Sequence, residues 1–288
     1  MTATRAQKQV LVTGATGFIG RHTVSLLRGR GIGTHACARS TGCDLEETGA
    51  LAPFHDRGIT HVIHLGGRTF VPHSWEDPGA FYRANTIGTQ HVLDFCRASG
   101  ARLVYVSAYV YGVPRSLPIA ESHPVAPNTP YNHSKWLAEE LCRFYAAQFE
   151  VPVAVLRPFN VFGPGQGDDF LIPTILKQAR SCGAITVKDA APKRDYLHVD
   201  DLAEALLLAL DLEPRFSLFN VGSGRSVSVG ELLDMAVRYS PRPLSWQATG
   251  EVRVNEVPDT VADISAINKA LDWSPRRTLQ EFLRSELA

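Results

Sequence analysis

The stretch Val10-Leu11-Val12-Thr13-Gly14-Ala15-Thr16-Gly17-Phe18-Ile19-Gly20 decides the fold of this 288-residue chain. A short apolar run leads into three glycines at three-residue spacing, and an amphipathic pattern follows them. Glycine allows a tight turn and a close backbone approach to a ligand, and the helix beginning here supplies free N–H groups and a positive dipole end. The stretch therefore predicts a strand–turn–helix unit that binds the pyrophosphate of a dinucleotide.

Apolar runs rich in Val and Ile alternate with amphipathic stretches of helix length along the rest of the chain, a pattern typical of an α/β fold with a doubly wound parallel sheet (Rossmann). The expected strands are 10–13, 33–38, 61–65, 102–107, 153–157 and 216–221. The expected helices are 18–28, 45–57, 78–99, 129–149 and 199–210. Ligands of such sheets bind beyond the carboxyl ends of the strands, so the segments after these strands should line the site.

Composition narrows the classes of function. Positive and negative side chains balance, with 29 Lys+Arg against 29 Asp+Glu, so we expect neither nucleic acid nor a membrane surface as a partner. No apolar run reaches the length of a membrane span and the polar start lacks a signal peptide's apolar segment, so we expect a cytoplasmic protein. The five cysteines are odd in number and lack Cys-x-x-Cys or zinc-ligand spacing, which indicates buried free thiols and no metal site.

The character of the chain changes after about residue 160, where glycines and prolines open a turn-rich stretch with shorter helical patterns. We expect a dinucleotide-binding domain over residues 1–160, to which residues 195–221 return. Residues 161–194 and 222–288 should form a smaller, discontinuous C-terminal lobe that binds the substrate.

The end of the second strand, Cys37-Ala38-Arg39-Ser40, bears on the choice of cofactor. A carboxylate at this place would bind the ribose hydroxyls of NAD, whereas an arginine favours the 2′-phosphate of NADP. Arg39 therefore favours NADP, with NAD as the second choice, and its alternative role is a solvated charge. Asp44 contacts the adenine edge or caps a helix that begins at Leu45, and the residues leave both roles open.

The segment Pro130-Tyr131-Asn132-His133-Ser134-Lys135 begins a long helical pattern in which Tyr131 and Lys135 share one face. A nearby ammonium and a cationic oxidised nicotinamide both favour the phenolate, so Tyr131 becomes a usable proton donor and acceptor. Ser107 leaves the fourth strand, where its hydroxyl could hydrogen-bond a carbonyl that is being reduced; its alternative role is that of a turn residue.

Taken together, these features resemble the extended short-chain dehydrogenase/reductase superfamily, and within it the NAD(P)-dependent sugar-nucleotide epimerase, dehydratase and reductase family. The resemblance covers nearly the whole chain. It is carried in order by the glycine turn, His64-Leu65-Gly66-Gly67, Asn85 in Ala84-Asn85-Thr86-Ile87-Gly88-Thr89, Ser107 before Tyr111-Gly112, Tyr131 with Lys135, Arg157-Pro158-Phe159-Asn160, Arg194-Asp195-Tyr196, and Arg253 with Glu256.

The resemblance implies a set of ligand contacts. Catalysis would fall to Ser107, Tyr131 and Lys135. The cofactor would contact Gly14, Thr16, Gly17, Phe18, Ile19, Gly20, Arg39, Ser40, Asp44, Leu45, Leu65, Gly66, Gly67, Tyr131, Lys135 and Pro158. A nucleotide-sugar substrate would contact Ser107, Asn160, Arg194 and Arg253, with the two arginines gripping its diphosphate. The alternative for each arginine is a salt bridge with Asp195 or Glu256.

Departures from the family pattern narrow the reaction. Gly66 and Gly67 stand where Ala-Ala is usual. The 4,6-dehydratases have Thr-Asp-Glu or Thr-Ser-Glu where this chain has Ser107-Ala108-Tyr109, so the acid and base for eliminating water are absent. The 3,5-epimerases carry a cysteine base at the position of Ala108. Hydride transfer at carbon 4 of the sugar remains.

We therefore expect an NADPH-dependent reductase of an NDP-4-keto-6-deoxyhexose, with a pattern most similar to the reductases that act on GDP-4-keto-6-deoxy-mannose. The alternatives are an NDP-sugar 4-epimerase with bound NAD, or a catalytically silent sensor or scaffold. The resemblance also implies a homodimer through the helices expected at 78–99 and 129–149. The base, the sugar and the stereochemistry at carbon 4 depend on loop shape.

Overall fold

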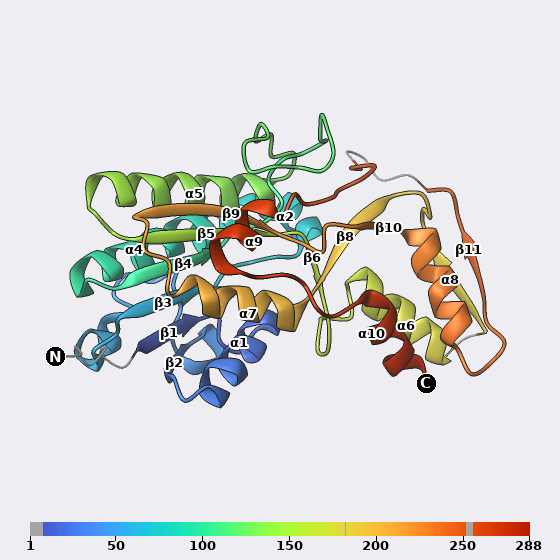
Figure 1. The fold of residues 1–288 in the computed structure, drawn as a ribbon, viewed down its shortest axis with the longest axis horizontal. Coiled ribbons are helices and arrows are strands. Elements are labelled where there is room, and N and C mark those ends of the chain that lie inside the picture. Colours follow the sequence, from blue (N-terminus) through green and yellow to red (C-terminus); the bar gives the residue numbers. More distant parts are fainter. Residues whose placement is uncertain (1–7, 182, 252–255) are drawn as a thin grey trace. The chain divides into compact units, whose positions relative to one another are not determined.

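The computed structural model describes residues 8–181, 183–251 and 256–288, which belong to two compact units (Figure 1). Unit 1 comprises Met1–Val110, Pro127–Arg157 and Ala203–Phe219. Unit 2 comprises Tyr111–Ala126, Pro158–Leu202 and Asn220–Ala288. The expected assignment of a dinucleotide to one part and of a substrate to the other stays a prediction.

A six-stranded sheet with the order β2-β1-β3-β4-β5-β9 supports unit 1. Its strands are β1 (Gln9–Thr13), β2 (Gly33–Cys37), β3 (His61–His64), β4 (Arg102–Val106), β5 (Val153–Pro158) and β9 (Phe216–Val221). The pairs from β2 through β5 are parallel. All six were predicted to within one residue at each end. The central strands β1, β3, β4 and β5 are largely buried and read as apolar runs, whereas the edge strand β2 is mostly half-buried.

Helices cover both faces of this sheet, with α4 and α5 on one side and α1 on the other (Figure 1). The helices are α1 (Phe18–Gly29), α2 (Val71–Glu76), α3 (Pro78–Phe81), α4 (Gly88–Ser99), α5 (Pro130–Gln148) and α7 (Val199–Ala209), which runs from unit 2 into unit 1. Between the sheet and α4 and α5 lies an apolar core that includes Val62, Leu93, Leu103 and Ala138. The core holds the carboxyl ends of the strands and the first turns of the helices in fixed places.

The helix expected at 78–99 is present as three consecutive segments, α3, a π-helical turn over Tyr82–Ile87 and α4. The wider π turn carries Asn85, which is 1% exposed, toward the interior. The Asn85 amide nitrogen donates to Ser134 Oγ at 2.9 Å and to the Arg68 carbonyl at 3.1 Å. This turn therefore links the end of β3 to the start of α5.

The α-helix expected at 45–57 is wrong: turns follow Asp44, and a 3₁₀ helix covers only Ala52–Arg57. Asp44 Oδ1 accepts a hydrogen bond from the Glu46 N–H at 3.1 Å, a local bond that competes with helix formation. Gly49 then adopts a φ of +82°, which ends any helical path. Asp44 therefore caps a turn, not the α-helix expected to begin at Leu45.

Cys37 and Cys43 form a disulfide, so the prediction of free thiols is wrong for this pair. Their Cα atoms lie 5.4 Å apart because a short 3₁₀ turn over Arg39–Thr41 leads into Gly42, whose φ of +80° reverses the chain. No familiar cysteine spacing signals this pair. Cys96 and Cys142 are free and buried, as predicted, and Cys182 lies outside the described residues.

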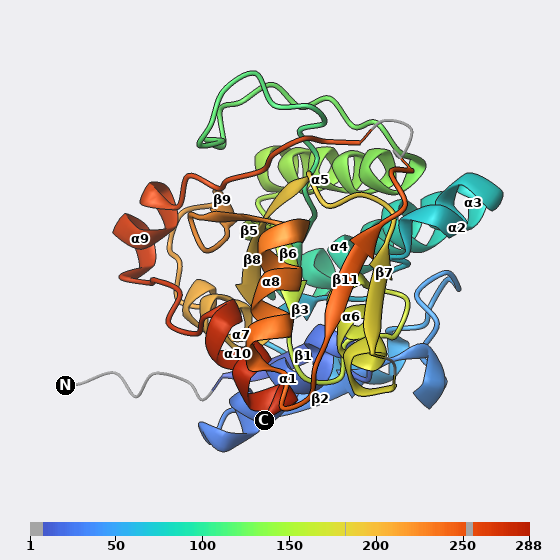
Figure 2. The same ribbon diagram turned by 90° about the vertical axis from the view of Figure 1, so that its right-hand side faces the viewer.

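Unit 2 contains a three-stranded sheet, β10-β8-β6, and a parallel pair, β11-β7, whose two strands run next to each other in Figure 2. The strands are β6 (Asn160–Phe162), β7 (Ala184–Val187), β8 (Lys193–His198), β10 (Ser226–Ser228) and β11 (Ser245–Ala248). The helices are α6 (Leu171–Ser181), α8 (Val229–Tyr239), α9 (Ser265–Leu271) and α10 (Leu279–Leu287). Ile175, Leu232 and Leu283 are buried in the core that α6, α8 and α10 share.

Within the described ranges, no helix is both long and apolar enough to cross a membrane. The same residues contain no group of three or more His, Cys, Asp or Glu side chains that could hold a metal ion.

Candidate active site

The glycine turn joins β1 to α1, as predicted, and two of its glycines are required by close backbone contacts. Gly14 has a φ of +66°, and a Cβ there would lie 2.7 Å from the backbone nitrogen of Gly66. A Cβ on Gly20 would lie 2.1 Å from the Gly14 carbonyl oxygen. The Gly17 N–H donates to that same oxygen at 3.0 Å, which closes the turn. The turn thus brings the ends of β1 and β3 together.

The start of α1 has the donors that a pyrophosphate requires. Gly17 is the N-cap residue and makes no side-chain cap, so the backbone N–H groups of the first turn, which begins at Phe18, have no capping side chain as a partner. Thr16 Oγ1 lies 2.9 Å from Ser40 Oγ, which joins the turn to the loop after β2. The residues present therefore fit the diphosphate of a dinucleotide.

The end of β3 is packed tightly around Leu65, Gly66 and Gly67. Thr13 Oγ1 accepts hydrogen bonds from the N–H groups of Leu65 at 3.2 Å and Gly66 at 3.1 Å. A Cβ on Gly66 would lie 2.8 Å from a Leu45 methyl carbon, and one on Gly67 would lie 2.5 Å from Asn85 Oδ1. The two glycines in place of the usual alanines thus leave room for these two side chains.

Tyr131 and Lys135 lie one turn apart near the start of α5, where Thr129 Oγ1 accepts the Asn132 N–H at 3.1 Å and caps the helix. Lys135 Nζ donates to the Val106 carbonyl at 2.6 Å and lies 4.4 Å from the centre of the Tyr105 ring. Burial lowers the pKa of Lys135 to about 8, while the Glu139 carboxylate acts in the opposite direction. Burial also raises the pKa of Tyr131 to about 12, so its phenol holds a proton at neutral pH.

Ser107 follows β4 directly and its hydroxyl donates to the Glu139 carboxylate. Arg157, at the end of β5, grips the same carboxylate through Nε at 2.9 Å and Nη2 at 2.5 Å. Both charged side chains are nearly fully buried, at 2% exposed for Glu139 and 3% for Arg157. In this structure the single Ser107 proton is therefore engaged by Glu139, and the expected hydrogen bond of Ser107 to a substrate carbonyl stays a prediction.

Glu139 was missed by the sequence reasoning, which found no carboxylate near Ser107. A signal was present: Glu139 stands four residues after Lys135, so it lies on the same face of α5. Both of its oxygens accept hydrogen bonds from Arg157, so this carboxylate is the buried partner of the arginine.

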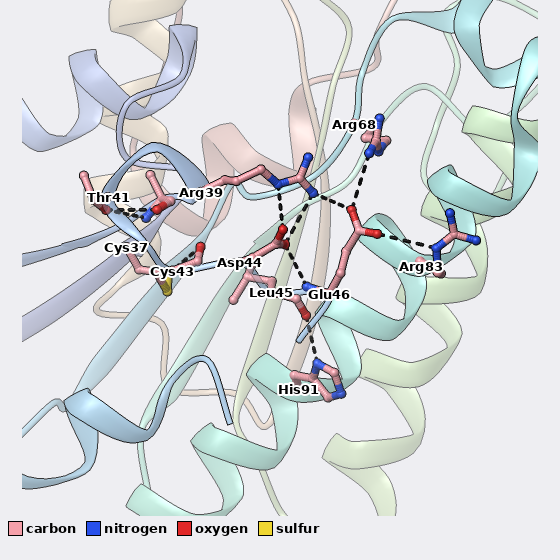
Figure 3. A network of polar contacts seen from close by, with 11 residues as sticks. Cys37, Arg39, Thr41, Cys43, Asp44, Leu45, Glu46, Arg68, Arg83 and His91 are labelled. Atoms are coloured by element: carbon pink, nitrogen blue, oxygen red, sulfur yellow. Dashed lines mark hydrogen bonds and ion pairs between the residues drawn. A yellow bond between two sulfur atoms is a disulfide. The ribbon is translucent and has the colours of Figure 1, made fainter. Parts of the chain in front are cut away.

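Arg39 follows β2 at the predicted place, but two carboxylates hold it (Figure 3). Its Nε lies 2.8 Å from Asp44 Oδ2, and its Nη2 also contacts Glu46. The hydrogen bond that Arg39 donates to Asp44 raises the pKa of Arg39. The pKa of Asp44 is lowered, chiefly by the hydrogen bond from the Glu46 N–H and to a smaller extent by Arg39. Leu45, between the two acids, is buried and accepts a hydrogen bond on its carbonyl oxygen from His91 Nδ1 at 2.8 Å.

The residues expected to bind the substrate in unit 2 are only partly accounted for. Asn160 in β6 donates to the Asp195 carbonyl at 3.3 Å, and Pro158, which was expected to contact the cofactor, ends β5. Arg194 Nη1 donates to the carbonyls of Lys193 at 2.7 Å and Val257 at 2.6 Å, and its Nη2 contacts Glu256. Arg194 is therefore in a salt bridge, but with Glu256 and not with its sequence neighbour Asp195. Arg253 lies outside the described residues.

The sequence of the chain is similar to those of nucleotide-sugar epimerases and reductases. The family model described as "NAD dependent epimerase/dehydratase family" matches residues 10–222. The chain is 30% identical to GDP-6-deoxy-D-mannose reductase of Pseudomonas aeruginosa, over 98% of this chain and 96% of that one. It is also 30% identical to UDP-glucose 4-epimerase of Azospirillum brasilense, over 99% and 92% of the two chains.

Two solved structures share the whole fold. One is RMD from Pseudomonas aeruginosa complexed with NADPH, with a TM-score of 0.89, 30% identity and 97% coverage of each chain. The other is MoeE5 in complex with UDP-glucose and NAD, with a TM-score of 0.88, 32% identity and the same coverage.

Proposed function

This chain belongs to the NAD dependent epimerase/dehydratase family, and we propose that within it the chain reduces the 4-keto group of an NDP-4-keto-6-deoxyhexose with NADPH. Similarity to GDP-6-deoxy-D-mannose reductase over nearly the whole of both chains supports this choice. The nicotinamide cofactor, when bound, supplies the hydride to carbon 4. The chain's own residues must supply the proton and hold the sugar.

The placement of Tyr131 one turn before Lys135 at the start of α5 is the observation that carries the proposal. A phenol whose pKa is raised to about 12 by burial keeps its proton at neutral pH, as a donor to oxygen 4 must. The Lys135 ammonium, one turn along α5, stabilises the phenolate that remains. Lys135 itself is fixed by the Val106 carbonyl.

Ser107 is the third residue proposed for catalysis, beside Tyr131 and Lys135, and its hydroxyl has a defined orientation. Because its hydroxyl donates to Glu139, its oxygen is left to accept a hydrogen bond. An acceptor at this place suits the Tyr131 hydroxyl or the alcohol newly formed at carbon 4. Elimination of water is disfavoured, since Ala108 and Tyr109 carry no carboxylate and Glu139 is paired with Arg157.

NADP is the proposed cofactor, with NAD as the second choice. The N–H groups at the start of α1, which no side chain caps, fit a pyrophosphate, and Arg39 after β2 fits a 2′-phosphate. One solved relative is complexed with NADPH and another with NAD, so the family accommodates both.

The reaction is tested with an NDP-4-keto-6-deoxyhexose made in place by a separate dehydratase. One NADPH should be consumed for each alcohol formed, and deuterium from labelled NADPH should appear only at carbon 4. Deuterium at another carbon would exclude both this reaction and 4-epimerisation.

A 4-epimerase is the second candidate, because UDP-glucose 4-epimerases are equally similar to the chain in identity. An epimerase oxidises and re-reduces the same carbon, so it would invert carbon 4 of an ordinary NDP-hexose with no net change in nicotinamide absorbance. Inversion of carbon 4 without a change in absorbance, together with no consumption of NADPH on any 4-keto sugar, would identify the chain as a 4-epimerase. A sensor or scaffold that lost catalysis would show neither reaction.

We also infer a homodimer formed through the helical segment 78–99 and α5. Two large apolar side chains on these elements are exposed, Ile87 at 42% and Phe144 at 54%. Light scattering should give twice the chain mass, and Phe144→Asp should shift it toward the monomer.

A further inference from the structure

Three arginines converge on one glutamate beside the proposed cofactor site (Figure 3). Glu46 Oε1 contacts Arg39 Nη2 and lies 3.6 Å from Arg68 Nη2, while Glu46 Oε2 lies 3.5 Å from Arg83 Nε. We call Arg39, Arg68 and Arg83 the arginine cluster. Among the carboxylates in the described part of the chain, Glu46 alone contacts all three.

The arginine cluster is assembled from three separate segments. Arg39 follows β2, Arg68 follows β3, and Arg83 lies in the π-helical turn. The Arg68 N–H donates to Asn85 Oδ1 at 2.8 Å, and the Cys37–Cys43 disulfide closes the loop that carries Arg39. The backbone of each segment is thus held independently of Glu46.

Asp44 and Glu46 differ in how firmly they are held. Asp44 Oδ1 accepts the Glu46 N–H and so belongs to the turn itself. The Glu46 carboxylate has only the three guanidinium groups as partners in the described residues, and its side chain is 17% exposed. It can therefore swing outward on its own bonds while the turn stays in place.

We propose that the Glu46 carboxylate occupies the place of a phosphate monoester and competes with it for the arginine cluster. This inference rests on the proposed use of NADP, whose 2′-phosphate is the ligand in question. Planar guanidinium groups match a phosphate as they match a carboxylate, and a dianion gains more than a monoanion from three of them. Glu46 thereby sets how strongly NADP is preferred, and Arg68 and Arg83 contribute alongside Arg39.

Charge counting gives the expected size of the effect. The arginine cluster carries three positive charges. Asp44, Glu46 and a bound dianion together would carry four negative charges, so the dianion would repel the Glu46 carboxylate and favour its departure. Removing one charge about 5 Å from a dianion in a solvent-exposed setting should change the dissociation constant by about tenfold.

Calorimetry with two nucleotides tests the inference in the full chain. Adenosine 2′,5′-bisphosphate carries the 2′-phosphate, and 5′-AMP is the same molecule without it. Glu46→Gln should bind the bisphosphate about tenfold more tightly than the wild type and 5′-AMP equally well. Glu47→Gln is the matched control, since this exposed neighbour undergoes the same charge change without touching the cluster.

Arg83→Ala provides a second reading, because it should weaken the bisphosphate selectively. If the wild type prefers the bisphosphate but Glu46→Gln gains nothing over Glu47→Gln, the competition by Glu46 is refuted while NADP preference stands. If the wild type and both glutamine variants bind the two nucleotides equally, both the competition and the NADP assignment fail. Thermal unfolding of each variant checks that the fold is retained.

Discussion

The Ser107 hydroxyl donates its hydrogen bond to the buried Glu139 carboxylate, which stands four residues beyond Lys135 on α5. The buried ion pair of Glu139 with Arg157 is thereby connected to Ser107, and Glu139 lies one helical turn from Lys135. The helix spacing explains the arrangement, since residues four apart share a face and Lys135 and Glu139 both turn toward the end of β4.

Removal of Glu139 should destabilise the fold strongly. Glu139→Ala removes the carboxylate that pairs with the buried Arg157, and breaking a buried ion pair typically costs about 3–5 kcal/mol. Glu140→Ala is the control, because Glu140 is half exposed and its pair with Arg143 should contribute less than about 1 kcal/mol. Chemical denaturation of both variants measures the difference, and equal midpoints would contradict the structural role of the buried pair.

Tyr131→Phe should abolish turnover and leave NADPH binding nearly intact, because only the proton-donating hydroxyl is lost. Tyr145→Phe, further along the same helix and bonded to Asp94 at 2.7 Å, is the control that should keep its activity. Turnover is followed by nicotinamide absorbance and binding by calorimetry. More than about a tenth of wild-type turnover in Tyr131→Phe would place the acid elsewhere.

Reduction should slow as the pH rises through about 8, where Lys135 loses its proton. Below this pH the ammonium stabilises the developing Tyr131 phenolate, and above it that support is gone. Tyr131, whose pKa lies near 12, does not titrate in this range. The profile of kcat/KM for the sugar at saturating NADPH checks the prediction; a constant value from pH 7 to pH 9.5 would rule out Lys135 as the titrating group.

Reduction of the Cys37–Cys43 disulfide should lower the free energy of unfolding by about 2 kcal/mol, as expected for a closed loop of this size. In the double variant Cys37→Ser/Cys43→Ser, a dithiol reductant should leave the free energy of unfolding unchanged. Denaturation with and without the reductant measures the change. If the reductant leaves the wild-type midpoint unchanged, and the Cys37 and Cys43 thiols of the unreduced protein react with an alkylating agent after unfolding, the disulfide does not form.

Arg194→Ala should weaken the binding of UDP, GDP or dTDP by roughly ten- to a hundredfold without changing NADPH affinity, as loss of a charge-assisted contact does. Arg242→Ala, which removes an exposed arginine of the same unit, should have no effect. Calorimetric titration with each nucleotide distinguishes them. An equal loss for NADPH would contradict the assignment of Arg194 to the substrate, and no loss at all would leave it as the salt-bridge partner of Glu256.

The positions of the six strands, the glycine turn and the Tyr131–Lys135 pair followed from the sequence by itself, because each depends on local rules. Strands buried on both faces must be apolar runs, and two residues four apart on a helix must share a face. Gly14 is needed for its positive φ and Gly20 for its contact with the Gly14 carbonyl, both within one turn of chain.

Only the tertiary structure decided which charges meet. Ser107 and Glu139 are 32 residues apart, and Arg194 and Glu256 are 62 apart. The partners of Arg39 required a turn after Asp44 in place of the expected helix, and the disulfide required the reversal at Gly42. Hydrophobic periodicity reports which face of an element is buried, but a long charged side chain chooses its partner only when packing has brought distant segments together.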